Sequence, residues 1–126
     1  MGHQHIKSGS PYESRYGFSR AVRAGDRVLV AGTAPIPPEG QQVGATAYDQ
    51  MMRCGEIAIA ALVEAGATAD HVVRTTMYIT DAADADEIGS AHSALFGSSA
   101  PAATMVVTQL LDPAWKVEIE VEAIVP

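Results

Sequence analysis

The chain has 126 residues, of which 48% are apolar and 18% charged, and its formal net charge is −7. These values predict one domain, residues 1–126, with a packed core, and they exclude a disordered chain and disfavour binding to the phosphate backbone of nucleic acid. Cys54 is the one cysteine, so an intrachain disulfide is excluded; no Cys/His set has metal-site spacing, and neither a metal nor a cofactor is expected.

Residues 1–16 are polar and rich in glycine and serine, which predicts a loosely ordered N-terminal lead-in outside the core. His3 and His5 lie here one residue apart, but a third metal ligand is lacking. The segment also lacks the apolar stretch of a signal peptide, so a cytoplasmic protein is expected.

A β-hairpin is predicted next. Two strand-like runs, Phe18–Val22 and Arg27–Gly32, flank Ala24-Gly25-Asp26, which has the composition of a hairpin turn. The following segment, Pro35–Gly44, holds three prolines and two glycines, so we expect an exposed loop.

Two helices are predicted in the middle of the chain. Thr46 is a suitable N-cap for a helix whose apolar residues recur every three or four positions up to Val63, and Gly66 is its stop signal. Its apolar stretch is far shorter than the ~20 residues of a membrane span, so no membrane association is expected. Asp81 is the predicted cap of the second helix, whose apolar stripe consists of Ile88, Ala91, His92, Leu95 and Phe96, with Gly97 after it.

Three further strands are predicted: Val72–Ile79 between the helices, then Ala102–Gln109 and Trp115–Val125, with the turn at Asp112-Pro113. The order of elements predicts an α+β fold, a mixed sheet of about five strands with a hairpin at each end and both helices on one face. The other face would be uncovered in a monomer, which favours an oligomer.

Short motifs in a fixed order run from Tyr16 to the C-terminus. The most informative are Gly17-Phe18-Ser19-Arg20-Ala21-Val22, Val30-Ala31-Gly32-Thr33, Val72-Val73-Arg74-Thr75-Thr76, Pro101-Ala102 and Glu120-Val121-Glu122-Ala123-Ile124. In order and spacing they resemble the RidA (YjgF/YER057c/UK114) family. The resemblance implies a chorismate-mutase-like fold and a homotrimer, whose sheets line a central barrel and whose three intersubunit clefts bind a small molecule.

The resemblance also shows a difference. Imine-deaminating relatives hold the substrate carboxylate with an arginine directly after the Pro-Ala pair, and this chain has Ala103 there. Phe18 replaces the tyrosine of the first motif, His92 replaces another tyrosine, and Met105 stands where some relatives have cysteine or threonine. Losing a bidentate arginine costs a carboxylate ligand about 2–5 kcal/mol in a desolvated site, so poor activity on 2-iminobutanoate is expected.

Carried over from the family, Glu120 is the candidate catalytic residue that would orient the attacking water, although Glu118 is an alternative because the strand register is open by two residues. Arg20 is the most plausible substitute cation, with Arg74 and Arg53 as further candidates. His92 lies on an apolar stripe and is more simply a packed residue. The substrate-binding candidates are Phe18, Arg20, Gly32, Ala103, Thr104, Met105 and His92.

Three functions follow from these residues. One is hydrolytic deamination of an imine or enamine, and the second is a binding module that captures a small, weakly polar molecule without chemistry. Phe18, Ala103 and Met105 favour binding. The third, the ribonuclease activity of the older family description, is disfavoured by the acidic charge.

Overall fold

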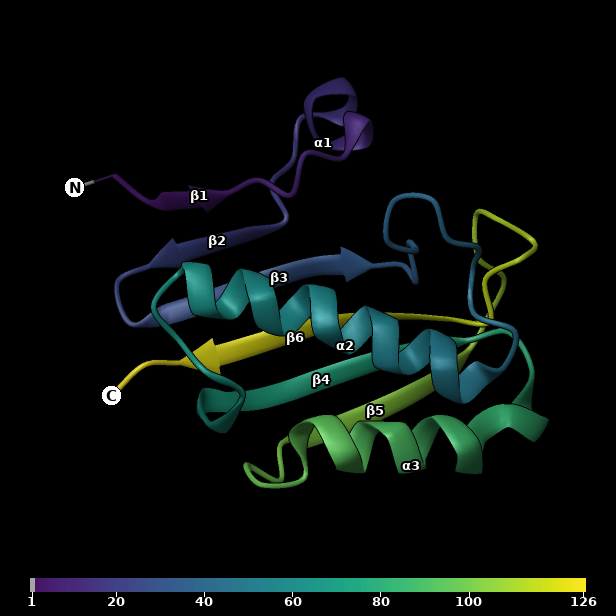
Figure 1. Cartoon of the computed structure of the whole chain (residues 1–126). Helices are drawn as coiled ribbons and strands as arrows, with labels where there is room; N and C mark the ends of the chain where they lie inside the picture. The colour runs from purple at the N-terminus through teal and green to yellow at the C-terminus, as the bar shows by residue number, and fades with distance from the viewer. Residues whose placement is uncertain (1) are drawn as a thin grey trace.

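The computed structural model describes residues 2–126. Six strands form one sheet, and three α-helices and two short 3-10 turns accompany it (Figure 1). The elements in chain order are β1 (Gln4–Ile6), α1 (Pro11–Tyr16), β2 (Ala21–Ala24), β3 (Arg27–Thr33), α2 (Ala47–Glu64), η1 (Ala69–His71), β4 (Val72–Ile79), η2 (Ala82–Asp84), α3 (Ala85–Phe96), β5 (Ala102–Val107) and β6 (Val117–Ile124). The predicted α+β class and mixed sheet are confirmed.

The strands lie in the order β1-β2-β3-β6-β4-β5. The predicted hairpin of β2 and β3 is present, and Gly25 in its turn has φ +63°, a conformation that glycine adopts without a steric cost. The strand β2 begins at Ala21, so Phe18 and Arg20, which were predicted to lie in this strand, precede it. The helices α2 and α3 connect β3 to β4 and β4 to β5.

The prediction of a second hairpin at the C-terminal end is wrong. β6 does not pair with β5; it lies between β3 and β4, antiparallel to both, while β5 is the edge strand and runs parallel to β4. Burial explains the placement. Alternate residues of β6, from Val117 to Ala123, are fully buried or nearly so, as a central strand requires, whereas β5 is mostly exposed.

Both long helices pack on one face of the sheet, as predicted (Figure 1). The side chain of Thr46 accepts a hydrogen bond from the Asp49 backbone and so caps α2. Asp81 has a different role from the predicted one: its side chain caps the 3-10 turn η2, and α3 begins only at Ala85. Within residues 2–126, neither α2 nor α3 covers the opposite face of the sheet.

The N-terminal segment is more regular than the expected loose lead-in. β1 pairs with β2, and Ser10 caps the short helix α1. Glu13 on α1 is 2% exposed, so this segment contributes a buried charge to the structure. The composition of the segment did not indicate this, because the order comes from contacts with residues further along the chain: β1 pairs with β2, and Glu13 contacts Arg20. Among residues 2–126, none of the helices combines the length and apolar character that crossing a bilayer requires.

Candidate functional site

Three glutamates lie on the sheet face that the helices leave open. Along β6, Val117, Ile119, Val121 and Ala123 face the helices and are buried, so the alternation of the strand turns Glu118, Glu120 and Glu122 to the other face. The three differ in exposure: Glu120 is exposed, while Glu118 and Glu122 are half-buried. Glu122 forms an ion pair with Arg27 of β3.

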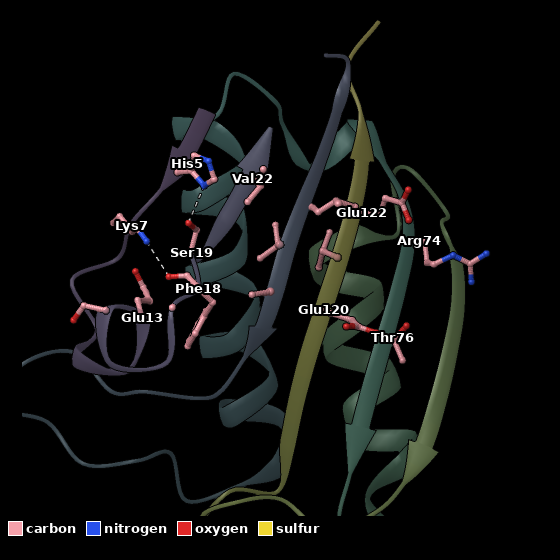
Figure 2. Close-up of a pocket in the computed structure, with 16 residues that line it drawn as sticks. His5, Lys7, Glu13, Phe18, Ser19, Val22, Arg74, Thr76, Glu120 and Glu122 are labelled. Atoms are coloured by element: carbon pink, nitrogen blue, oxygen red, sulfur yellow. Dashed lines mark hydrogen bonds between the residues drawn. The ribbon is translucent and has the colours of Figure 1, made fainter. Parts of the chain in front are cut away.

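Two cavities border these residues. The first, about 910 Å³, lies between the N-terminal segment and the open sheet face, and Figure 2 shows Glu120, Glu122 and Arg74 on its sheet side. On its other side, Lys7 donates to the Phe18 carbonyl over 2.9 Å. Of the predicted site residues, Phe18 and Glu120 line this cavity.

The second cavity, about 940 Å³, brings more of the predicted residues together. Phe18, Arg20 and Gly32 line it, and the glutamate that joins them is Glu118. The rest of its wall comes from α1, from one side of α2 and from the loop before β6. This cavity is the candidate functional site. The register of β6 against β3 places Glu118, and not Glu120, in the cavity with Arg20 and Gly32.

Arg20 is almost fully occupied by its own chain. Its Nη1 donates to the Gly32 carbonyl over 2.6 Å and to the Thr33 hydroxyl over 2.9 Å. Its Nε lies 3.6 Å from the Glu13 carboxylate, with both side chains nearly buried. Glu13 in turn accepts hydrogen bonds from the Ser8 backbone and hydroxyl. The guanidinium therefore holds the N-terminal segment against β3.

Glu118 occupies space that a glycine provides. A Cβ atom built on Gly32 would come within 2.5 Å of Glu118 Oε1, so a side chain at position 32 would displace this carboxylate. Burial raises the pKa of Glu118 above its ordinary value of 4.5, the nearby Arg20 charge lowers it, and Glu120 raises it. A carboxyl group with a raised pKa in a cavity has the properties of a general acid or base.

Glu120, the predicted catalytic residue, is paired with a neighbour on β4. The Tyr78 hydroxyl donates to Glu120 Oε1 over 2.7 Å, and this hydrogen bond raises the pKa of Tyr78. Glu120 lines the first of the two cavities and not the second, where Arg20 and Gly32 lie. Its carboxylate faces the first cavity across the open sheet surface (Figure 2).

The segment Ala103, Thr104 and Met105 lies elsewhere in the single chain. It belongs to the edge strand β5 and lines neither cavity. Met105 pairs with Met77 of β4 and packs against the core. In one chain this segment is thus separated from Phe18 and Glu118, and it would meet them only if another subunit brought its β5 edge alongside.

His92 is a packed residue in the structure. Its Nε2 lies 2.7 Å from the hydroxyl of Thr75, which is 0% exposed, and its ring is tilted against Phe96 at a centroid distance of 5.4 Å. Burial lowers the pKa of His92. Thr75 and His92 lie on the helix side of the sheet, away from both cavities.

The other candidate cations also have defined positions. Arg53 of α2 lines the second cavity, where its Nε donates to the Ile36 carbonyl over 2.6 Å and its Nη1 lies 3.3 Å from Glu56. Arg74 of β4 lines the first cavity, and its side chain points away from the N-terminal segment on the other side of that cavity (Figure 2). No group of three potential metal ligands occurs in residues 2–126.

Sequence reasoning missed two features of the cavities. One is Glu13, the buried partner of Arg20, which lines the first cavity. It lies three residues after Ser10 and shortly before Gly17, a spacing that could have indicated a capped short helix. The other is the set of aromatic side chains that line the second cavity beside Phe18: Tyr12, Tyr16 and Trp115. Tyr12 and Tyr16 lie four residues apart on α1 with stacked rings, so they would have been grouped if this helix had been predicted. Trp115 comes from a distant loop, and no local pattern joins it to them.

A family model described as Endoribonuclease L-PSP matches residues 9–125. An uncharacterised protein of Streptomyces coelicolor is 39% identical over 94% of this chain and 89% of its own length, and a RutC family protein of Pyrococcus abyssi is 38% identical over 85% and 84%. Among solved structures, a YjgF/YER057c/UK114 family member from Mycobacterium tuberculosis is similar with a TM-score of 0.89 and 40% identity, covering 98% of this chain and 100% of that chain.

Proposed function

Because the chain belongs to the RidA (YjgF/YER057c/UK114) family, we propose that it forms a homotrimer whose intersubunit clefts bind a small organic molecule, and that it is a poor 2-imino acid deaminase. The open sheet face and the distance between β5 and the second cavity support the trimer. An assembly that places the β5 edge of one subunit beside the second cavity of another would complete the predicted site.

The occupation of Arg20 carries the second half of the proposal. Ala103 has no charge to offer, and Arg20, its candidate substitute, already has the Gly32 carbonyl, the Thr33 hydroxyl and the Glu13 carboxylate as partners. A substrate carboxylate would have to compete with these groups, at a cost of the order of the ~2–5 kcal/mol that separates paired from unpaired buried charges. Recognition of a 2-imino acid by its carboxylate is therefore disfavoured.

Hydrolysis of an imine or enamine without a carboxylate is the second candidate. Glu118 favours it, because a half-buried carboxyl group with a raised pKa is suited to exchange protons with an attacking water and a leaving amine. Glu120 remains the alternative in a cleft that two subunits complete. Cleavage of RNA is not proposed, since the net charge of −7 opposes the approach of a polyanion.

Hydrolysis of 2-iminobutanoate, generated in situ by an amino-acid oxidase, tests the proposal in the natural chain and in Ala103→Arg. We expect the natural chain to be slow and the variant to be faster by tens- to thousands-fold, the range that ~2–5 kcal/mol predicts. Ala102→Arg, with the charge one residue away on the other side of β5, is the matched control. Rapid hydrolysis by the natural chain would overturn the proposal, and light scattering checks the trimer separately.

A further inference from the structure

The basic side chains of the second cavity are all engaged by their own chain. Lys7 donates to the Phe18 carbonyl, and Arg53 to the Ile36 carbonyl and Glu56. The partners of Arg20 include Glu13, which neutralises its charge from behind the cavity wall. Each of these cations already has partners in its own chain, so an anionic ligand would have to compete with them.

The acidic side chains outnumber the basic ones here. The cavity is lined by three basic residues, Lys7, Arg20 and Arg53, and by four acidic ones, Glu56, Glu64, Asp112 and Glu118. Counting Glu13, which is paired with Arg20 and buried, adds one more negative charge beside the cavity. The local field therefore favours a positively charged ligand.

Glu118 differs from the other acidic groups of this wall. It is half-buried, it sits against Gly32, and within residues 2–126 no side-chain hydrogen bond or ion pair engages its carboxylate. By contrast, Glu56 is paired with Arg53, and Asp112 accepts from the Ala114 backbone. A desolvated carboxylate with free acceptor sites is stabilised by an ammonium or iminium donor.

The remaining wall suits the organic part of such a ligand. Tyr12, Tyr16, Phe18 and Trp115 present aromatic rings to the cavity, and Ile36 and Ile57 add aliphatic surface. Aromatic faces attract organic cations as well as apolar groups. A ligand with one cationic nitrogen on a short apolar body matches both the carboxylate and the rings.

We infer that this cavity binds a small organic cation, a primary ammonium or a protonated imine on a short apolar body without a carboxylate, and that Glu118 is the residue that selects it. The inference rests on the proposed small-molecule site and narrows its ligand class. It gives Glu118 the role opposite to that of the family's arginine, because a carboxylate selects a cation where the arginine selects a carboxylate.

Two probes of equal length test this on the full chain: butylammonium and butanoate, titrated by calorimetry or by amide chemical shifts. We expect butylammonium to bind more tightly by about ten- to a hundredfold, the contribution of one charge-assisted hydrogen bond. The isosteric change Glu118→Gln should abolish this preference. Glu39→Gln removes the same charge from an exposed residue outside the cavity and should change the preference by less than about threefold.

The outcomes separate the two proposals. Equal or tighter binding of butanoate, or an unchanged preference in Glu118→Gln, overturns the choice of a cation and leaves a small-molecule site standing. If neither probe produces shifts at residues lining the cavity, the small-molecule site itself is contradicted. Thermal melts of both variants check that each retains the fold.

Discussion

Glu13 and Arg20 form a nearly buried ion pair, 3.6 Å between Oε2 and Nε, that joins helix α1 to the segment entering β2. The side chains are 3% and 10% exposed. Because Arg20 also donates to the carbonyl of Gly32, the pair connects the N-terminal segment to the strand that borders the second cavity. The pair therefore contributes to the order of this segment, together with the pairing of β1 and β2.

Replacing Glu13 by alanine should lower the free energy of unfolding by about 3 kcal/mol, because it leaves the Arg20 guanidinium buried without its counter-charge. Urea unfolding measures the loss. Glu39→Ala removes an exposed glutamate from the loop after β3 and should change stability by less than about 0.5 kcal/mol. An equal effect of the two changes would show that the pair has no special role.

The double change Glu13→Leu with Arg20→Met refines this test. It removes both charges and keeps apolar volume in their place, so stability should recover most of what Glu13→Ala loses. If the double variant is as unstable as the single one, the loss comes from packing of α1 and not from the uncompensated charge.

Binding of butylammonium should weaken as the pH falls. Burial, and to a smaller extent Glu120, raises the pKa of Glu118 above 4.5 although Arg20 opposes this shift, so the carboxylate that holds the cation is protonated at a higher pH than an ordinary glutamate. Affinity is therefore complete well above this raised pKa and is lost as the pH falls through it. Titrations over a pH series should show this limb in the natural chain and not in Glu118→Gln.

The sequence predicted the helices and most strands because their signals are local. Thr46, Gly66 and the alternation of Val72–Ile79 each act within a few residues, and the structure confirms these elements. Strand order depends on contacts between distant segments. The turn at Asp112-Pro113 resembled a hairpin, but β6 is buried on its helix face from Val117 to Ala123 and bonds to two neighbours, so it took a central place instead.

The site was predicted in its composition and not in its arrangement. Phe18, Arg20 and Gly32 do lie together, since the segment that enters β2 runs beside the end of β3, where the Arg20 carbonyl accepts a hydrogen bond from the Ala31 backbone. Whether Glu118 or Glu120 joins them depends on the register of β6 against β3, which no local signal fixes. That Arg20 is already paired was invisible, because its partner Glu13 lies in a segment whose composition indicated disorder.

Gly55 of α2 should tolerate no large side chain, because a Cβ atom there would overlap the side chain of Leu95 on α3. Gly55→Leu is expected to destabilise the protein by about 2 kcal/mol through overpacking. Combining it with Leu95→Ala should restore part of the loss, since the added and removed volumes meet at the same contact. Gly89→Ala, with no atom within 4 Å of its new Cβ, should be neutral or stabilising by up to about 1 kcal/mol. Urea unfolding of Gly55→Leu, Leu95→Ala and the double variant measures the coupling, with Gly89→Ala as the control. Strictly additive effects of the two changes would contradict the close approach of Gly55 and Leu95.

Acid should destabilise the protein through His92. Burial lowers the pKa of this imidazole below its ordinary value of 6.5, so the folded state holds the neutral form while the unfolded chain takes up a proton. Because the unfolded state then binds more protons, the stability present above 6.5 is lost as the pH falls toward the lowered pKa of the folded state. His92→Gln can still bond to Thr75 and does not titrate, so its stability should change less between about pH 7.5 and about pH 5. The exposed His3 provides the control: His3→Gln should keep the full pH dependence of the natural chain. If His92→Gln and His3→Gln lose the same stability on acidification, His92 is not the group responsible, and its contact with Thr75 has no bearing on the acid response.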